Sequence, residues 1–581
     1  MTYLFNQPSA FASELIEGFV AANADKVRQV PGGVVRSTRS QPGSVAVIVG
    51  GGSGHYPAFA GLVGQGLAHG AAMGNLFASP SAQQIYNVAR AADNGGGVLL
   101  TFGNYAGDVL HFGQACERLR SEGIPCELLA VTDDISSASV DEREKRRGVA
   151  GDLTVFKVAS AAAEAGYDLA RVLQVAQRAN ARTRSFGVAF SGCTLPGASH
   201  PLFEVASGRM ALGLGIHGEP GIKETDVPTA DELAEIFVER LLGELPPDVA
   251  SVAGQRVAPI LNGLGSVKYE ELFVVYRRVA QLLAEAELQV VEPDVGEFVT
   301  SFNMAGASLT LMWLDDELET FWRAPANTPA YRKGSVIVAE PLSATECEVQ
   351  AEEALPAASA ESQQSAQRVL GLLEAVATLL QDNAEKLGDI DAVAGDGDHG
   401  IGMERGVLGA VEKAREVAAK GAGAGTLLCR AADAWADKAG GTSGALWGVA
   451  LTALGTAIGD RQAPSAERVA SGVRAAQQGI QHFGKARVGD KTMVDVLVPF
   501  SDTLNQRVEA GDSLTDAWLQ AAQVAEQAAQ ATAQLLPKMG RARPLAERSL
   551  GTPDAGAVSL AMIVNTVGRL LLAQATTTHG V

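Results

Sequence analysis

The chain has 581 residues, a formal net charge of −20 and 65 glycines. Its length is sufficient for about three or four domains. The excess of acidic residues excludes a typical nucleic-acid-binding protein, which carries a basic surface, and disfavours binding to an anionic membrane. The five cysteines are scattered and form no CxxC pair, which indicates neither a zinc site nor a disulfide framework.

The sequence predicts a cytoplasmic protein. Its first residues lack the basic region and apolar run of a secretory signal peptide. No apolar run reaches the roughly 18 residues that suggest a bilayer span, so we expect no membrane segment.

Residues 1–340 alternate short apolar runs with helical patterns. The runs typical of strands are 44–51, 97–102, 126–132 and 185–192, and helical patterns cover 81–93 and 152–166. This alternation predicts an α/β fold with a largely parallel sheet and functional loops at the carboxyl ends of its strands. A further β-rich stretch that includes 257–263 and 308–314 predicts a second α/β subdomain.

One window of this region has no charge. Between Arg39 and Arg90 there is no Asp, Glu, Lys or Arg, and Gly, Ser, Asn and Gln are frequent. One interpretation is a buried core segment. The other is an uncharged, glycine-rich wall that suits a neutral polar ligand approached by backbone.

The rest of the chain has a different character. Residues 341–366 are rich in Ala, Ser, Glu and Gln, contain two prolines and show no periodic pattern, which predicts a linker. Residues 367–581 predict an all-α domain. Its eight expected helices are 367–386, 404–419, 425–438, 443–458, 465–480, 491–509, 514–534 and 555–574.

Three motifs in residues 1–340 contain histidine or aspartate side chains that could act as acids, bases or nucleophiles. GGGSGH, residues 50–55, follows a predicted strand and suggests a backbone turn that approaches a small ligand with His55 beside it. GNYAGD ends at Asp108, which is either a solvated helix cap or the partner of His55 in an acid/base pair. His217 lies between glycines in GIHGEPG; it is either structural or a nucleophile towards a carbonyl carbon.

Two motifs in the helical region indicate phosphate and metal chemistry. Asp391, Asp396 and Asp398 place three carboxylates within eight residues, and hard carboxylate oxygens favour Mg²⁺, often shared with nucleotide phosphates. The alternative is an acidic, solvated turn. GGTSG opens a predicted helix, where backbone N–H groups and the hydroxyls of Thr442 and Ser443 can bind an anion.

Taken in order, these motifs resemble the dihydroxyacetone kinase family over nearly the whole chain. GGGSGH, NYxGD, GIHGEPG, AGDGDHG, GGTSG, GDKTMVD and ERS all occur in the family's order. The resemblance implies a ketose-binding α/β region, 1–340, joined to an ATP-binding eight-helix barrel, 367–581. It further implies ATP-dependent phosphorylation of a terminal hydroxyl of a short ketose, and a homodimer.

The resemblance also implies roles for single residues. His217 is expected to form a covalent hemiaminal with the ketose, and His55 and Asp108 to act as the acid/base pair. The residues expected to line the substrate pocket are Gly52, Ser53, Gly54, His55 and Asp108. Those expected to hold two Mg²⁺ ions are Asp391, Asp396 and Asp398. Those expected near the nucleotide are His399, Gly400, Gly402, Thr442, Ser443, Gly484, Met493, Arg541, Asp554 and Gly556.

Two departures from the family pattern bear on the substrate. The family commonly has Glu where this chain has Tyr56, and Lys where it has Gly103. A charged pair near the pocket is therefore absent, so a ketotetrose such as erythrulose rivals dihydroxyacetone as the substrate. Two other functions remain open, an FMN cyclase activity and a non-catalytic ketose sensor.

Overall fold

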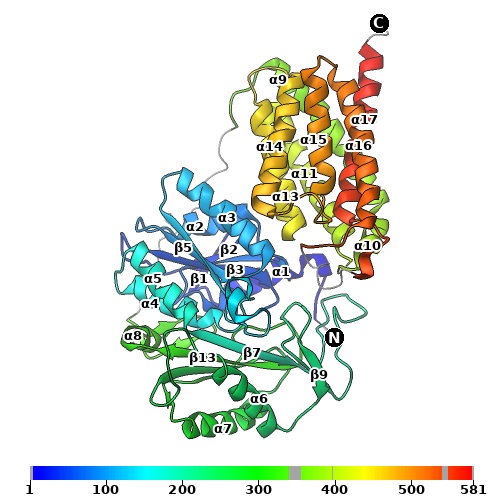
Figure 1. Ribbon diagram of the computed structural model, residues 1–581. Coiled ribbons are helices and arrows are strands. Elements are labelled where there is room, and N and C mark those ends of the chain that lie inside the picture. Colours follow the sequence, from blue (N-terminus) through cyan, green and yellow to red (C-terminus); the bar gives the residue numbers. More distant parts are fainter. Residues whose placement is uncertain (1–3, 338, 341–354, 396, 540–546, 579–581) are drawn as a thin grey trace. The chain divides into compact units, whose positions relative to one another are not determined.

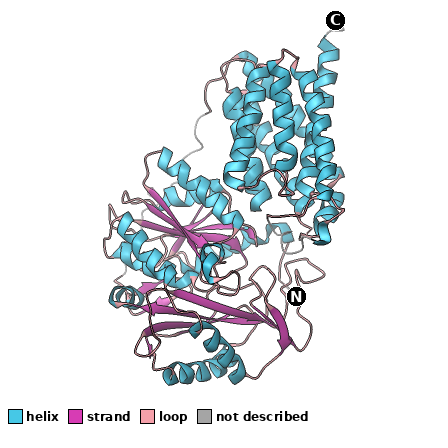
Figure 2. Ribbon diagram, in the orientation of Figure 1, coloured by secondary structure: helices cyan, strands magenta, loops and turns pink. Residues whose placement is uncertain are grey.

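The structure is a computed structural model that describes residues 4–337, 339–340, 355–395, 397–539 and 547–578. The chain divides into two compact units, residues 1–350 and 351–581. Each unit has its own hydrophobic core, and each is described by itself below. The N-terminal unit contains two large β-sheets and the short pair β14 (Ala326–Asn327) and β15 (Arg332–Lys333), and the C-terminal unit is helical in its described part (Figures 1 and 2).

The first sheet of the N-terminal unit has six strands. Its strands in spatial order are β1 (Val27–Val30), β2 (Gly33–Arg36), β4 (Gly70–Leu76), β3 (Ala46–Ser53), β5 (Val98–Gly103) and β6 (Cys126–Val131). The pairings β4–β3, β3–β5 and β5–β6 are parallel, whereas β1–β2 and β2–β4 are antiparallel. The predicted parallel arrangement therefore holds for the part of the sheet that carries GGGSGH and GNYAGD.

The second sheet is mostly antiparallel. Its strands in spatial order are β11 (Gln289–Val290), β10 (Arg256–Gly263), β13 (Gly306–Leu314), β7 (Thr183–Ala189), β8 (Arg209–Leu212) and β9 (Lys223–Asp226), with β12 (Asp294–Gly296) also paired to β10. Only the short strands β11 and β12 pair in parallel with β10 among the described pairings. The second subdomain is thus confirmed as a mixed α/β unit, but the parallel pattern does not extend to it.

Helices cover both sheets. They are α1 (Phe11–Ala22), α2 (Ala82–Ala92), α3 (Ala106–Ser121), α4 (Asp152–Glu164), α5 (Leu169–Ala181), α6 (Ala230–Leu242), α7 (Tyr269–Glu285) and α8 (Asp316–Arg323). Alternate residues of a strand face opposite sides of a sheet. In β3, Val47 and Val49 join the core shared with α4 and α5, whereas Ala46 and Ile48 join the core under α2 and α3.

The same alternation orders the second sheet. In β13, Met312 and Leu314 belong to the core shared with α4 and α5, whereas Leu309 and Leu311 pack under α6 and α7. The layers of this unit therefore run α2/α3, first sheet, α4/α5, second sheet, α6/α7 (Figure 1). Helix α4 is buried between the two sheets over Asp152–Ala163, whereas α5 buries one face and leaves the other exposed.

The C-terminal unit is a bundle of antiparallel helices. Its described helices are α9 (Ala360–Asp382), α10 (Ala384–Ala392), α11 (His399–Ala419), α12 (Ala424–Ala439), α13 (Gly441–Ile458), α14 (Ala466–Gly484), α15 (Val494–Glu509), α16 (Leu514–Ala531) and α17 (Ala555–Thr578). From α11 onward, consecutive helices pack on one another. Because consecutive helices run antiparallel, the N-termini of α11, α13, α15 and α17 lie at the same end of the bundle.

Two boundaries in this unit differ from the prediction. Helix α9 begins at Ala360, so residues 360–366 of the predicted linker are helical; Ser359 caps the helix by accepting the N–H of Ser362 at 3.1 Å. The remainder of the predicted linker up to residue 354 lies outside the described residues. The expected helix 367–386 also spans two helices, because α9 ends at Asp382 and α10 starts at Ala384.

Helices α13 and α17 are long and apolar enough, by length and composition, to pass a test for membrane spans. Both pack inside the bundle, α13 between α12 and α14 and α17 against α16 and α9. Core helices of soluble proteins commonly have this composition, so the two helices carry no membrane argument.

Candidate active site

The loop after β3 presents His55. Strand β3 ends at Ser53, whose buried hydroxyl donates to the carbonyl of Gly74 at 2.7 Å. Gly54 adopts a φ of +105°, which L side chains rarely adopt. A Cβ at Gly52 would lie 2.8 Å from the backbone N of Ala78, so the glycine permits close packing on the segment after β4.

This packing fixes the imidazole of His55. The ring of Phe77 stacks on His55 with centroids 5.0 Å apart and planes 12° from parallel. His55 is 2% exposed, and its Nδ1 lies 2.7 Å from the carbonyl oxygen of Thr300. A carbonyl only accepts hydrogen bonds, so Nδ1 carries the hydrogen and Nε2 is left to face the site.

His217 reaches the same place from the other sheet. It lies in the loop between β8 and β9, and its Nε2 is 3.0 Å from Nε2 of His55. On its other side, Nδ1 of His217 lies 3.0 Å from Oε1 of Glu219, and Oε2 of Glu219 accepts the backbone N–H of His217 at 3.0 Å. The ring of Tyr105 packs edge-to-face on His217 with centroids 4.7 Å apart.

These contacts link His55, His217 and Glu219 through hydrogen-bonding groups in a row. Nδ1 of His217 donates to the Glu219 carboxylate, and Nδ1 of His55 donates to Thr300, so both Nε2 atoms would present lone pairs at 3.0 Å unless one proton lies between them. The two Nε2 atoms are thus close enough to share one proton, with the Glu219 carboxylate on the other side of His217.

The pKa values agree with this arrangement. Burial and the neighbouring His217 lower the pKa of His55 to about 3, so His55 itself is neutral near pH 7. Although burial alone would raise it, the charge and hydrogen bond of His217, with the Arg147 guanidinium, hold the pKa of Glu219 well below its usual range. Glu219 is therefore a permanent anion behind His217.

Asp108 sits in the first turn of α3, directly after β5. Its side chain is buried, and its Oδ1 has no hydrogen-bond partner among the described residues. Burial raises the pKa of Asp108 to about 7, partly offset by the hydroxyl of Ser79. A carboxyl group that titrates near neutral pH in a buried position is suited to general-base chemistry.

The predicted His55–Asp108 pair is not a hydrogen-bonded pair in this structure. The described contacts of the His55 ring nitrogens are Thr300 and His217, and the carboxylate next in the chain is Glu219. Glu219 and Tyr105 were not predicted as site residues from the sequence. The signal for Glu219 was its place two residues after His217, in a short glycine-rich loop where a tight turn brings the two side chains together.

A second buried carboxylate lies beside Asp108. Asp152 is 2% exposed, and its Oδ1 has no hydrogen-bond partner among the described residues. Burial and the neighbouring carboxylates of Asp133 and Asp108 raise the pKa of Asp152 well above its usual range. A Cβ at Gly103 would lie 3.3 Å from Oδ2 of Asp152 and 3.2 Å from the ring of Tyr105. Gly103 thus borders both the Asp152 carboxylate and the ring that packs on His217.

The predicted nucleotide residues gather at helix N-termini of the C-terminal unit. His399, Gly400 and Gly402 open α11, Thr442 and Ser443 open α13, Met493 precedes α15, and Asp554 and Gly556 flank the start of α17. These are the helices whose N-termini share one end of the bundle. Helix N-termini carry partial positive charge and free N–H groups, so their convergence favours a polyanion without a cluster of basic side chains.

Contacts show the surroundings of several of these residues and bring one pair of them, Met493 and Gly556, together. Nε2 of His399 lies 3.0 Å from Oγ of Ser559 in α17. A Cβ at Gly556 would lie 3.6 Å from Cβ of Met493. Gly400 has a packing role, because a Cβ there would lie 1.9 Å from the carbonyl oxygen of Ala384. Gly484 ends α14 and borders Leu446 of α13.

Carboxylates repel one another at this end of the bundle. Burial, with the nearby Asp391 and Asp495, raises the pKa of Asp554 to about 7, and partial burial with Asp391 raises the pKa of Asp398. A divalent cation would relieve this repulsion, and the oxygen-only donor set is the kind that Mg²⁺ prefers. The described carboxylates therefore fit a Mg²⁺ site. Asp396 and Arg541 lie outside the described residues, among which no group of three or more metal-ligating side chains is found.

Two further residues belong to this end of the bundle and were not predicted. Asp495 accepts the backbone N–H groups of Gly489 and Thr492 and so orders the loop before α15. Lys491 is 5% exposed, and its Nζ donates to the carbonyl of Ser549 at 2.7 Å. Both come from GDKTMVD, which the sequence analysis used only as a family motif.

Together, a buried pair of histidines on an α/β unit and a group of carboxylates at helix N-termini of a helical unit are the arrangement of a two-domain kinase. The chain matches the Dak1 domain over residues 17–330 and the DAK2 domain over residues 393–569. It therefore belongs to the dihydroxyacetone kinase family.

Full-length relatives are similar to this chain. It is 70% identical over 578 residues to the L-erythrulose kinase of Pectobacterium atrosepticum, covering 100% of this chain and 98% of that protein. It is 54% identical to the D-erythrulose kinase of Mycolicibacterium smegmatis, covering 98% of each chain. The crystal structure of the dihydroxyacetone kinase from C. freundii in complex with AMP-PNP and Mg²⁺ is 29% identical, with a TM-score of 0.52 over 98% of this chain and 99% of that one.

Proposed function

We propose that the protein transfers a phosphoryl group from ATP to a terminal hydroxyl of erythrulose, with the ketose held as a hemiaminal on His217. The observation that carries the proposal is the chain of contacts from His55 through His217 to Glu219. It gives one imidazole a fixed anion on one side and an exchangeable proton on the other.

The hemiaminal step uses that proton. As the ketone carbonyl replaces the contact between the rings, the shared proton passes to Nε2 of His55 and leaves a lone pair on Nε2 of His217. The lone pair forms a bond to C2, the carbonyl π electrons move to oxygen, and that oxygen takes the proton from His55. His217 becomes a substituted imidazolium whose Nδ1–H stays hydrogen-bonded to Glu219. Polyols such as glycerol have no carbonyl and cannot be held in this way.

Asp108 is the base for the second step. Its unpartnered Oδ1 can accept the proton of a terminal hydroxyl while that oxygen attacks phosphorus, and its pKa near 7 lets it be ionised at neutral pH. Fixing C2 on His217 restricts the rotation of the adjacent hydroxymethyl group, which converts binding into orientation.

The choice of a tetrose rests on Gly103 and Asp152. With no side chain at residue 103, the buried Asp152 carboxylate has no lysine beside it and keeps an oxygen without a partner. An additional hydroxymethylene group has a hydroxyl to offer such an acceptor, whereas dihydroxyacetone is one carbon shorter. The names of the similar full-length kinases support the same choice.

At the nucleotide end, ATP with Mg²⁺ supplies the phosphoryl group and neutralises its developing charge when bound. We propose that Asp391, Asp396 and Asp398 hold two Mg²⁺ ions, and that the first turns of α11, α13, α15 and α17 contact the phosphates. Arg541 is proposed near the nucleotide on the same grounds as in the sequence analysis. The homodimer and the cytoplasmic location remain predictions.

The test is ATP consumption with D-erythrulose, L-erythrulose and dihydroxyacetone. We expect a higher kcat/KM for one erythrulose enantiomer than for dihydroxyacetone. In His217→Ala, turnover should fall at least about 100-fold, because no nucleophile is left to orient the ketose. The matched control is His200→Ala, an exposed histidine in the same subdomain, which should behave as wild type. Retained turnover in His217→Ala would exclude the hemiaminal, and a preference for dihydroxyacetone would exclude the tetrose.

A further inference from the structure

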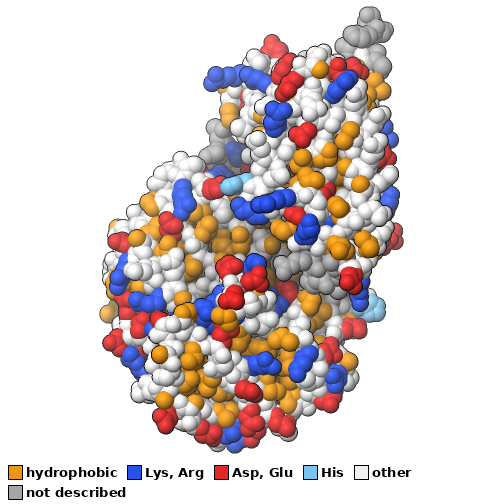
Figure 3. Space-filling view, in the orientation of Figure 1, with side chains coloured by type: hydrophobic (Ala, Val, Ile, Leu, Met, Phe, Trp, Pro, Cys, Tyr) orange, Lys and Arg blue, Asp and Glu red, His pale blue; other side chains and the backbone are white. Residues whose placement is uncertain are grey.

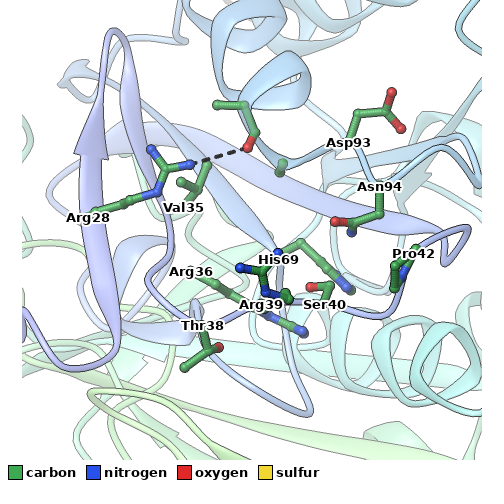
Figure 4. A pocket seen from close by; sticks show the side chains of 12 residues that line it. Arg28, Val35, Arg36, Thr38, Arg39, Ser40, Pro42, His69, Asp93 and Asn94 are labelled. Atoms are coloured by element: carbon green, nitrogen blue, oxygen red, sulfur yellow. Dashed lines mark hydrogen bonds between the residues drawn. The ribbon is translucent and has the colours of Figure 1, made fainter. Parts of the chain in front are cut away.

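A cavity of about 360 Å³ lies in the N-terminal unit away from the candidate active site (Figure 4). Its wall includes the chain from Arg28 to Pro42 and the segment around Asn94. Pro42 precedes β3 and Asn94 precedes β5, so the cavity is at the amino ends of these parallel strands. His55 follows the carboxyl end of β3, and eight residues of strand span roughly 25 Å. The cavity and the histidine pair are therefore at opposite ends of the sheet.

The lining is basic although the protein is acidic. Arg28, Arg36 and Arg39 line the cavity, against the single carboxylate of Asp93 among its twelve lining residues (Figure 4). The arginines lie just before the uncharged window of the sequence. In a chain of net charge −20, three guanidinium groups around one cavity favour an anionic occupant.

Arg36 builds the floor of the cavity. Its side chain is 5% exposed, pairs with Glu164 at 2.6 Å, and donates from Nε to the carbonyl of Ala68 at 3.1 Å. These partners hold the guanidinium in a fixed position. Since Glu164 balances its charge, binding of an anion rests mainly on the other groups of the lining.

Two buried donors of the lining have no partner among the described residues. They are Nε of Arg28 and the side-chain amide nitrogen of Asn94. Among the described residues, the Arg28 guanidinium makes one long contact, 3.5 Å from Nη2 to the carbonyl of Ala91. A buried donor without a partner is costly, and two that line one cavity indicate a missing acceptor.

His69 adds a third donor in a fixed tautomer. Its Nδ1 accepts the backbone N–H of Val47 at 3.1 Å, so in the neutral ring the hydrogen is on Nε2. His69 is 3% exposed and lines the cavity. The backbone N–H of His69 donates to the carbonyl of Val47 at 2.8 Å, which fixes the ring against the start of β3.

We propose that this cavity binds a phosphate group, either free or carried by a small phosphomonoester, through Arg28, Arg39, Asn94 and His69. Guanidinium forks and several separate N–H donors suit the three oxygens of a phosphate better than the two of a carboxylate. The volume exceeds what a free ion needs and lies in the range of small-metabolite sites.

The test is calorimetric titration of the full-length protein, without nucleotide and at constant ionic strength. The probes are inorganic phosphate, glycerol 3-phosphate and malonate. The variant Arg28→Gln/Arg39→Gln should raise the dissociation constant of the phosphate probes at least about tenfold. The charge-matched control is Arg415→Gln/Arg474→Gln, two exposed arginines of the helical unit, which should bind as wild type.

A single substitution guards against misfolding of the double variant. Asn94→Asp keeps the side-chain volume but replaces the unpartnered donor with a carboxylate, so phosphate binding should be lost while the melting temperature and the kinase activity stay unchanged. Tighter binding of glycerol 3-phosphate than of phosphate identifies a phosphomonoester as the ligand, and the reverse identifies the free ion. Equal binding by the Arg28/Arg39 variant and its control, equal binding of malonate, or no heat from either phosphate probe at about 10 mM would overturn the proposal.

Discussion

Glu219 determines what His217 can do. An imidazole between glycines has no preferred tautomer, but the carboxylate of Glu219 at 3.0 Å from Nδ1 keeps the hydrogen there and directs Nε2 towards His55. A carboxylate in this position would act on the reaction through the histidine that it orients, so we propose Glu219 as a positioning residue.

We therefore expect Glu219→Gln to lower kcat/KM roughly 10- to 100-fold, because the amide neither fixes the tautomer as firmly nor balances the imidazolium. The readout specific to positioning is ¹³C NMR of C2-labelled ketose, in which the signal of tetrahedral, hemiaminal C2 should weaken relative to the carbonyl signal. Glu224→Gln, an exposed glutamate of β9, is the control. An unchanged C2 signal with Glu219→Gln would contradict this role.

The buried carboxyl group of Asp108 is expected to lower the free energy of unfolding at neutral and higher pH. Its pKa rises from 3.8 to about 7 on folding, so the unfolded chain releases this proton at lower pH than the folded chain does. Stability is therefore lost as pH rises from about 4 to 7. We expect Asp108→Asn to be inactive but more stable than wild type at pH 8, by on the order of 4 kcal/mol, with the difference vanishing near pH 4.

The measurement is denaturant unfolding of the Asp108→Asn variant and wild type at pH 4.5 and pH 8. Asp93→Asn, whose Oδ1 accepts the Gly95 N–H at 3.0 Å, is a control outside the active site. A stability difference for Asp108→Asn that does not change with pH would show that Asp108 is not buried and neutral in the folded state.

Sequence motifs predicted His55 and Asp108 because each belongs to a glycine-containing motif after a predicted strand, and His217 because glycines flank it on both sides. They could not predict that His55 contacts His217, since the two residues are 162 positions apart and belong to different sheets. Glu219 was missed because one acidic residue in a polar loop has no signature of its own. Its role depends on a turn geometry that only the folded loop reveals.

At the level of elements, apolar runs predicted the buried strands β5, β6, β7, β10 and β13 well. The antiparallel order of the second sheet was not predictable, because β8 and β9 are four residues long and β9 reads Lys-Glu-Thr-Asp. Such a polar edge strand shows neither alternation nor β-branched enrichment. The boundary between α9 and α10 was missed for a similar reason, since no Gly or Pro interrupts residues 377–387.

Helix α9 begins before the first residue of the apolar pattern because Ser359 caps its N-terminus. Ser359→Ala should lower the free energy of unfolding of the helical unit by about 1 kcal/mol, since the Ser362 N–H would lose its acceptor. Ser359→Asp, which keeps a capping oxygen, should restore the stability. Scanning calorimetry measures both, and an unchanged unfolding temperature in Ser359→Ala would mean that helix α9 does not depend on this cap.

At the scale of the whole molecule, each unit has its own hydrophobic core, so we expect a ligand to change the unfolding temperature of one unit without changing that of the other. A ligand that binds only the folded form of one unit stabilises that unit. We expect erythrulose to raise the unfolding temperature of the N-terminal unit, and ATP with Mg²⁺ to raise that of the helical unit.

Asp391→Asn should abolish the shift caused by ATP with Mg²⁺ and leave the shift caused by erythrulose intact. The control is Asp389→Asn, an exposed carboxylate of the same helix α10. A full shift with ATP and Mg²⁺ in Asp391→Asn would exclude this residue as a metal ligand.

The net charge of −20 is spread over the molecule. On the face seen in Figure 3, acidic and basic side chains are interspersed among apolar and neutral ones. The predicted binding of a nucleotide polyphosphate by an acidic protein has a physical explanation in the shared orientation of α11, α13, α15 and α17. The dipoles of these helices come from the backbone, so they attract phosphate without adding basic residues to the sequence.

The two imidazoles that we propose for the reaction belong to loops of different sheets, His55 after β3 and His217 between β8 and β9. The sheets also meet directly, where the backbone N–H of Ser185 donates to the carbonyl of Asp133 at 2.8 Å. Helix α4 is buried between the sheets over Asp152–Ala163. We therefore expect a larger side chain at one of its buried alanines to push the sheets apart and to change the 3.0 Å distance between the two Nε2 atoms, although no residue of the site is altered.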